Sequence, residues 1–172
     1  TYGAYILAKA GSEITELSGL KGKVFCYPST TSSSGYIYPR AVFRQAGIDP
    51  ETHMTPRFTT DHGESLKALL NGGCEGAAVY DEAFLKADDP AAFTVIKSTE
   101  QIPWDAYCVG DIVDADTTEK LKAALTELTL GSELAGSVLS ELNFRGFLPG
   151  DDKLYDSVRG LEKFLSLETD TK

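Results

Sequence analysis

The sequence has little that suits a nucleic-acid or membrane partner. Lys and Arg together number 16, against 26 Asp and Glu, so the formal net charge is −10. This acidic balance argues against binding to nucleic acid or to an anionic bilayer surface, whereas a small anion can still be held by local N–H groups and hydroxyls. No apolar run approaches the about 20 residues that span a bilayer. No signal segment is present and the chain begins at Thr1, so we expect a mature or excised fragment.

Cysteine is also scarce. The three cysteines, Cys26, Cys74 and Cys108, are odd in number, and their spacing matches no zinc or CxxC pattern, so neither a metal nor a cofactor is expected. We expect all three to be packed apolar side chains. The alternative is a Cys26–Cys74 disulfide, which is disfavoured because the two residues should lie at opposite ends of neighbouring strands. Cysteine usage therefore does not indicate the compartment.

Apolar runs of strand length alternate with segments of helical period, which is typical of an α/β fold with a mostly parallel sheet. The expected strands are residues 5–8, 23–27, 54–59, 75–80, 93–97 and 106–109. The expected helices are residues 36–45, 64–70, a short one beginning at Asp81, 117–128, 133–142 and 155–165. We predict that strands 23–27, 54–59 and 75–80 form a parallel core with helices on both faces.

Polar loops follow three of these strands. Residues 28–34, 60–63 and 80–81 come after consecutive parallel strands, and the carboxyl edge of such a sheet is where ligands bind. The first two loops each open a helix, so helix N–H groups are expected to converge there. The sequence therefore predicts a ligand site at this edge.

The first loop has an unusual run of hydroxyl side chains that ends in Ser32, Ser33 and Ser34, followed by Gly35. One short hydroxyl is enough to cap a helix, and a flexible capping loop is the alternative interpretation. A tetrahedral oxyanion would use the whole cluster, and the glycine leaves room for it. We therefore predict an oxyanion site.

His62 lies in the second loop, directly before a glycine and a helix, where it would donate a hydrogen bond to an anion, although a structural role is the alternative. Tyr80 and Asp81 follow the third strand, and Asp105 follows an Ile-Pro-Trp segment. The two aspartates have structural alternatives as a helix cap and a turn residue. Beside an anion, either carboxylate would need a protonated ligand oxygen or an ammonium group.

Several segments resemble one known family in the same order along the chain. They are 20–25, 32–36, 39–40, 46–50, 61–62, 68–72, 76–79, 102–105 and 146–149. Together they resemble the phosphate, phosphite and phosphonate substrate-binding proteins of ABC transporters, which have a two-lobed, type 2 periplasmic-binding fold. The resemblance implies binding rather than catalysis, an extracytoplasmic location and permease subunits as partners. It also implies ligand contacts from Ser32, Ser33, Ser34, His62 and Asp105, and less directly from Tyr80 or Asp81.

The resemblance implies that residues 17–101 form the complete second lobe. Residues 1–16 then belong to the first lobe, and residues 102–172 supply a crossing and the carboxyl-terminal part of that lobe. The amino-terminal portion of the first lobe has no counterpart in this sequence. We therefore expect the helices of residues 117–165 to expose apolar faces, with either an oligomeric or swapped arrangement to cover them or a partly disordered carboxyl-terminal half.

Three other functions remain as alternatives. A hydrolase triad would consist of Ser34, His62 and either Asp81 or Asp105. The sequence, however, has no G-x-S-x-G nucleophile elbow. The same fold could also sense a ligand for a signalling protein. A different ligand such as a sulfonate is disfavoured, because it brings no proton to Asp105.

Overall fold

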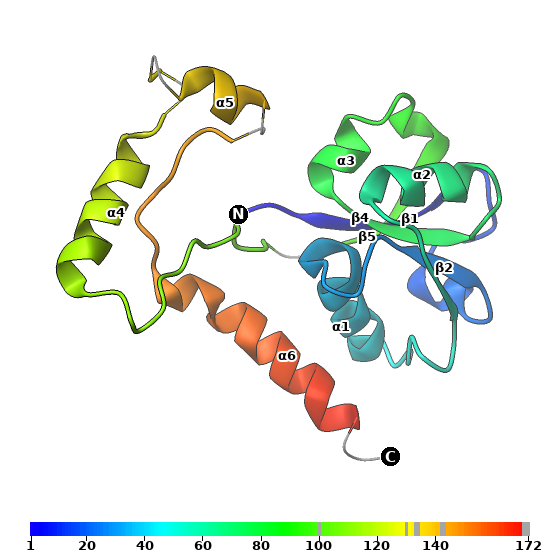
Figure 1. Ribbon diagram of the computed structural model, residues 1–172. Helices are drawn as coiled ribbons and strands as arrows, with labels where there is room; N and C mark the ends of the chain where they lie inside the picture. Colours follow the sequence, from blue (N-terminus) through cyan, green and yellow to red (C-terminus); the bar gives the residue numbers. More distant parts are fainter. Residues whose placement is uncertain (100, 130, 133–134, 142–143, 170–172) are drawn as a thin grey trace. The chain divides into compact units, whose positions relative to one another are not determined.

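The computed structural model describes residues 1–172 except residues 100, 130, 133–134, 142–143 and 170–172 (Figure 1). The described chain forms two compact units. The first unit contains residues 1–104 together with residues 155–172, and the second contains residues 105–154. The first unit carries the sheet.

The sheet has five strands in the order β3-β2-β4-β1-β5. They are β1 (Ala4–Lys9), β2 (Val24–Tyr27), β3 (Thr55–Phe58), β4 (Gly76–Tyr80) and β5 (Phe93–Ser98). Strand β2 pairs in parallel with both of its neighbours, β3 and β4, which confirms the predicted parallel core. Strand β1 runs antiparallel to β4 and β5. The sheet is thus mixed, with β2, β3 and β4 all running in the same direction.

Helices cover both faces of this sheet, as predicted (Figure 1). Helix α1 lies on one face, and helices α2 and α3 lie on the other. The helical elements of the first unit are η1 (Leu17–Leu20), η2 (Ser33–Ile37), α1 (Tyr38–Gln45), α2 (His62–Leu70), α3 (Asp81–Leu85), η3 (Pro90–Ala92) and α6 (Asp156–Thr169). η1 and η3 are 3-10 helices and η2 is a π-helix.

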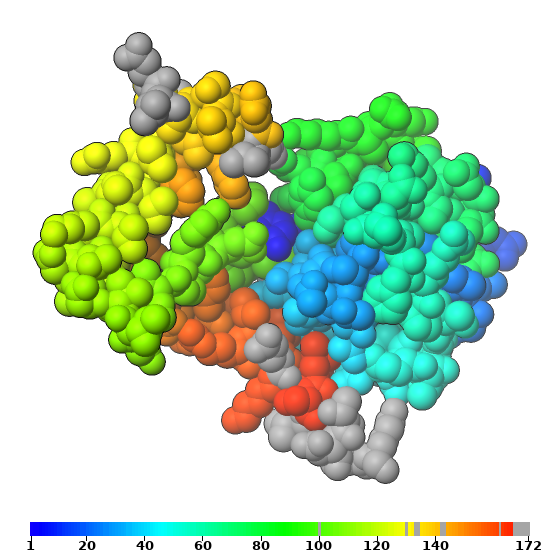
Figure 2. Space-filling model, in the orientation of Figure 1, coloured from blue at the N-terminus to red at the C-terminus, as the bar shows by residue number. Residues whose placement is uncertain are grey.

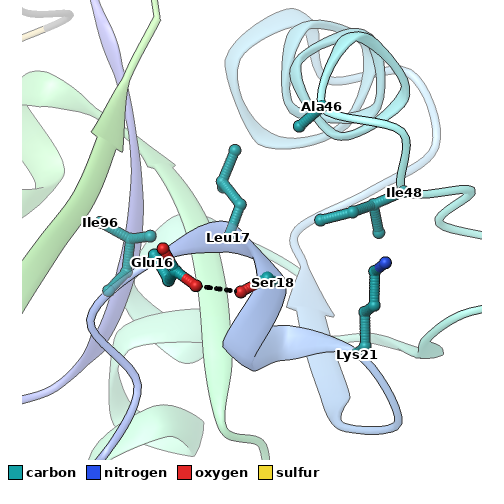
Figure 3. A pocket seen from close by; sticks show the side chains of 7 residues that line it. All are labelled: Glu16, Leu17, Ser18, Lys21, Ala46, Ile48 and Ile96. Atoms are coloured by element: carbon teal, nitrogen blue, oxygen red, sulfur yellow. Dashed lines mark hydrogen bonds between the residues drawn. The ribbon is translucent and has the colours of Figure 1, made fainter.

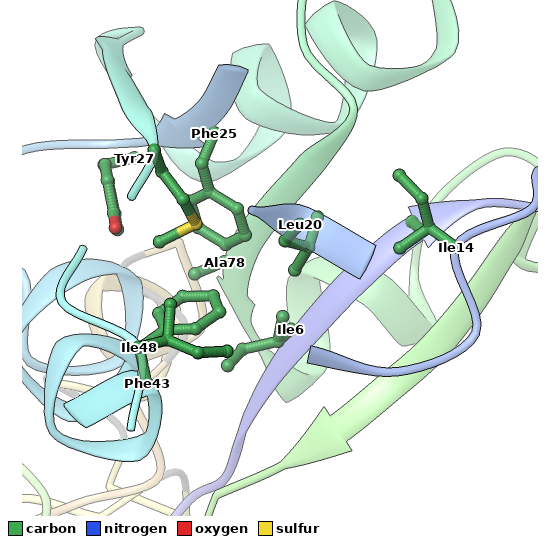
Figure 4. Packing of buried hydrophobic residues seen from close by; sticks show 10 residues of the cluster. Ile6, Ile14, Leu20, Phe25, Tyr27, Phe43, Ile48 and Ala78 are labelled. Atoms are coloured by element: carbon green, nitrogen blue, oxygen red, sulfur yellow. The ribbon is translucent and has the colours of Figure 1, made fainter. Parts of the chain in front are cut away.

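Alternation along the strands divides the apolar core into two layers. Phe25 and Tyr27 of β2 pack on the α1 face with Ile6 and Phe43, whereas Cys26 packs on the opposite face (Figure 4). The Phe25 and Phe43 rings meet edge to face with centroids 5.2 Å apart. Burying such side chains stabilises the fold by about 1.5–3 kcal/mol each, so these two layers fix the position of the strand ends.

The prediction for the cysteines was wrong. Cys26 and Cys74 form a disulfide with Cα atoms 6.0 Å apart, and Cys108 is free and exposed rather than packed. Cys74 lies two residues before the start of β4, and β2 pairs with β4 through Phe25 and Cys26 near that start. The two cysteines therefore lie at the same height of the sheet, not at opposite ends.

The second unit contains helices α4 (Ala115–Glu127) and α5 (Gly136–Glu141). The 3-10 helix η4 (Asp152–Tyr155) spans the point where the chain returns to the first unit. The strand predicted at residues 106–109 is absent, because an extended segment becomes a strand only when another strand supplies hydrogen-bond partners. The predicted helix 133–142 is described only from 136 to 141; residues 133, 134 and 142 lie outside the described residues.

Large apolar side chains are exposed in the second unit. No residue of α4 is buried, and Leu121 of α4 and Val138 of α5 are 44% and 53% exposed. This exposure agrees with the expected apolar surface of residues 117–165. An oligomeric or swapped cover for it stays a prediction, as do the lobe boundaries at residues 17 and 101.

Candidate functional site

The carboxyl ends of β2, β3 and β4 lie at one edge of the sheet, because the three strands are parallel and adjacent (Figure 1). β2 leads into the serine loop and η2, β3 leads into α2, and β4 leads into α3. All three loops of the predicted site therefore belong to the same edge of the first unit. In Figure 2 the bright blue surface around residues 30–40 adjoins the teal surface of α2.

Ser32 caps the helical segment that continues from η2 into α1. Its hydroxyl accepts a hydrogen bond from the N–H of Gly35 at 3.0 Å, and its carbonyl accepts from Tyr36 and Ile37. The bond from Ile37 at 3.1 Å spans five residues, which makes the first turn a π-turn, a geometry that is frequent at functional sites. One serine is thus the cap, and Ser33 and Ser34 are additional hydroxyls at the same helix end.

Gly35 is required by packing. A Cβ atom at this position would overlap the ring of Pro28, so the serine turn is folded tightly back onto the end of its own strand. Ser34 is buried with 2% of its surface exposed, and Ser33 is partly buried. The turn therefore holds its N–H groups and hydroxyls in a fixed cradle.

His62 connects all three strand ends. It begins α2, which follows β3; its Nε2 lies 3.4 Å from the hydroxyl of Ser32, which follows β2. Its Nδ1 accepts a hydrogen bond of 3.3 Å from the N–H of Tyr80, the last residue of β4. The His62 and Tyr80 rings also meet edge to face at 4.7 Å. One side chain thus joins the serine loop to the end of β4.

These contacts determine the tautomer of His62. A backbone N–H can only donate, so Nδ1 carries no proton and neutral His62 is protonated at Nε2. Burial lowers the pKa of His62 below its usual value, although the carboxylate of Asp61 partly opposes this shift. Nε2–H then donates to Ser32, whose oxygen also accepts from Gly35. The hydroxyl hydrogen of Ser32 is left to donate to a bound oxyanion.

Three residues that support His62 were not predicted as part of the site. Asp61 is the N-cap of α2, and its carboxylate accepts from the N–H of Glu64 at 2.8 Å. Thr59 and the fully buried Ser65 share a hydroxyl hydrogen bond of 2.7 Å, which joins the end of β3 to the first turn of α2. The sequence signal was a threonine at a strand end six positions before a serine on the buried face of the next helix.

The predicted acids have different surroundings. Asp81 is the first residue of α3, and its two carboxylate oxygens accept backbone N–H groups of Gly3 and Glu82, both at 2.9 Å. This side chain already ties the end of β4 to the segment before β1. Asp105 is the first residue of the second unit, whereas the serine cradle belongs to the first unit. The structure thus brings Ser32, His62 and Tyr80 into contact, with Ser33 and Ser34 on the same turn.

A comparison with known families decides what this chain is. Residues 1–155 match the family described as the ABC transporter, phosphonate, periplasmic substrate-binding protein. The chain belongs to this family. Its members are binding components of transporters rather than enzymes, and the family is extracytoplasmic. Among the described residues, no helix is both long enough and apolar enough to cross a membrane.

Individual relatives of this phosphonate-family protein are distant. The phosphate-import protein PhnD of Mycolicibacterium smegmatis is 25% identical over 140 residues, which cover 73% of this chain and 44% of that protein. The binding protein component of a phosphonate ABC transporter from Pseudomonas aeruginosa has a TM-score of 0.71 at 22% identity, covering 95% of this chain and 57% of that one. PhnD1 from Prochlorococcus marinus, solved with methylphosphonate, has a TM-score of 0.76 at 18% identity, covering 96% and 67%.

The structural likenesses confirm the two-lobed periplasmic-binding fold class. The chain spans under half the length of the curated relative and a little over half of the first structural one. Within this family, the contacts of His62 also disagree with a hydrolase triad. A triad histidine donates its Nδ1–H to a carboxylate, whereas Nδ1 of His62 accepts from Tyr80.

A separate pocket of about 340 Å³ lies away from the serine cradle (Figure 3). Its lining residues precede β2, follow α1 or belong to β5, so it lies at the opposite edge of the sheet. They are Glu16, Leu17, Ser18, Lys21, Ala46, Ile48 and Ile96. This pocket includes none of the predicted ligand residues.

Proposed function

We propose that this family member is the solute-binding component of an ABC transporter for a phosphorus oxyanion, with phosphonate preferred over phosphite and phosphate. The observation that carries the proposal is the contact of His62 with both Ser32 and the N–H of Tyr80. It brings donors from three strand ends to one place. The family to which the chain belongs delivers its ligand to permease subunits, which are the partners we propose here.

The donors suit an oxyanion. Ser32 offers its hydroxyl hydrogen, and Ser33 and Ser34 offer further hydroxyls at the start of a helical segment that runs to Gln45. The first N–H groups of a helix have no partner within it, and the helix dipole favours negative charge at that end. Hydrogen bonds to a charged group contribute about 1.5–3 kcal/mol each, so three or four of them would supply micromolar affinity.

We further propose that Tyr80 and Asp105 both contribute to ligand binding, and that Asp105 accepts a hydrogen bond from the protonated side of the ligand. An ionised carboxylate can only accept, so it selects a ligand that brings a proton on oxygen or an ammonium group. Asp81 is a weaker candidate for this role, because both of its oxygens already accept backbone N–H groups. A fully deprotonated sulfate would meet an unpaired acid and be rejected.

Calorimetric titration tests this proposal. Phosphate, phosphite, methylphosphonate, 2-aminoethylphosphonate and sulfate would each be titrated into the natural protein that carries these 172 residues. We expect at least one phosphorus oxyanion to bind at micromolar or tighter affinity, and sulfate to bind about fivefold to 150-fold more weakly, since an acid left unpaired against the ligand costs about 1–3 kcal/mol. Tight binding of sulfate alone would refute the role of Asp105, and binding of none would refute the function.

A further inference from the structure

Tyr38 has a buried hydroxyl for which the fold gives no explanation. The residue is 6% exposed, and its hydroxyl has no hydrogen-bond partner among the described residues. Burying an unsatisfied hydroxyl is costly, and each such group in a native protein calls for a reason. The position of Tyr38 suggests one.

The backbone of Tyr38 belongs to the serine turn. Its N–H donates to the carbonyl of Ser33, which closes the π-turn that opens α1. A shift of the serine turn toward a bound oxyanion would therefore be transmitted directly to Tyr38. Gly35 in the same turn packs closely against Pro28, so there is little free space on that side of the turn.

The side chain of Tyr38 lies where the chain leaves the first unit. It packs in a buried cluster with Ala4 and Ile102, and Tyr2 contacts the edge of this cluster. Tyr2 and Ile102 exchange two backbone hydrogen bonds, of 2.9 and 2.7 Å, and the first unit ends just beyond them at Trp104. The Tyr38 side chain thus packs in one cluster with Ile102, close to the end of the first unit, and Val158 and Leu161 of α6 pack against the same cluster.

Resting on the proposed function, we infer that Tyr38 is a positioning residue that couples the oxyanion cradle to the segment around Ile102. Its hydroxyl gains a hydrogen-bond partner in that segment when the ligand binds. The ligand-free protein carries the unsatisfied hydroxyl, and ligand binding releases this cost. Tyr38 therefore contributes to affinity without touching the ligand.

The test is Tyr38→Phe, with Tyr27→Phe as the matched control. Tyr27 also has a buried hydroxyl without a described partner, but its ring packs among Phe25, Tyr36 and Phe58, away from Ile102. Affinity for the best ligand of the calorimetric panel would be measured, together with association and dissociation rates by stopped flow. Thermal unfolding would be followed without ligand.

We expect Tyr38→Phe to weaken binding by about threefold to tenfold, the value of one neutral hydrogen bond. The change should appear in the dissociation rate, with the association rate unchanged and the ligand-free protein at least as stable as wild type. Tyr27→Phe should bind within about twofold of wild type. Unchanged affinity in Tyr38→Phe, or a loss of ligand-free stability, would overturn the inference while wild-type binding still supports the function; no binding by wild type would overturn both.

Discussion

We expect the Ser32 hydroxyl to contribute both to folding stability and to ligand binding, whereas the Ser33 and Ser34 hydroxyls contribute to ligand binding alone. The Ser32 oxygen accepts from Gly35 and from His62, so Ser32→Ala removes a helix cap and leaves Nε2–H of His62 without its acceptor. No hydrogen bond of the Ser33 or Ser34 hydroxyl is seen within the described part of the chain. The double variant Ser33→Ala/Ser34→Ala therefore removes only donors that a ligand would use.

The expected magnitudes separate the two cases. Loss of the Ser32 cap should cost about 1 kcal/mol of unfolding free energy, and loss of its hydroxyl donor about 1.5–3 kcal/mol of binding free energy. The double variant should lose about 2–4 kcal/mol of binding free energy, which is roughly a 30-fold to 900-fold rise in Kd. Its unfolding free energy should stay within about 0.5 kcal/mol of wild type.

Two measurements check this difference. Calorimetry with the tightest phosphorus oxyanion gives the binding free energies, and urea unfolding without ligand gives the stabilities. If the double variant bound every ligand as tightly as wild type, the serine run would be only a capping loop. If Ser32→Ala left the unfolding free energy unchanged, the π-turn would not depend on its cap, and the assignment of Ser32 to two roles would be wrong.

Three further outcomes are expected. Because burial lowers the pKa of His62 in the folded protein, its stabilising effect is complete above the unfolded pKa of about 6.5 and is lost as the pH falls below it. Thermal unfolding between about pH 5 and about pH 8 should show this loss in wild type and a smaller one in His62→Gln. Gly35→Ala should destabilise the protein by about 1–3 kcal/mol in urea unfolding, since the added methyl overlaps Pro28, and an unchanged midpoint would contradict that packing. The disulfide closes a loop of 48 residues, so Cys26→Ala/Cys74→Ala should cost about 4 kcal/mol of unfolding free energy, and a cost near zero would contradict the pairing.

The parallel core could be predicted because its signals are local. Each of β2, β3 and β4 is a short run bounded by turn residues, and the helices between them follow a different period. The strand at residues 106–109 failed for the opposite reason. Its apolar pattern is local, but strand formation depends on a partner elsewhere in the chain, which periodicity does not reveal.

The site was predicted from topology rather than from any one motif. Parallel strands bring their carboxyl ends together, so loops far apart in sequence could be assigned to one edge. The roles of the acids depend on positions within about 1 Å, and the sequence does not carry that information. Asp81, for example, accepts the N–H of Gly3, which makes it less available to a ligand than the sequence suggested.

The charge of the three loops constrains the form of the ligand. Residues 28–34, 60–63 and 80–81 contain two acids and no Lys or Arg, and burial lowers the pKa of His62, which disfavours its charged form. The carboxylate of Asp61 also satisfies the first turn of α2, so the helix that begins with η2 is the main source of positive potential. Neutral donors and one helix end stabilise a single negative charge better than two. The cradle should therefore favour the monoprotonated form of a phosphorus oxyanion, and the proton that this form carries is what a carboxylate such as Asp105 would accept.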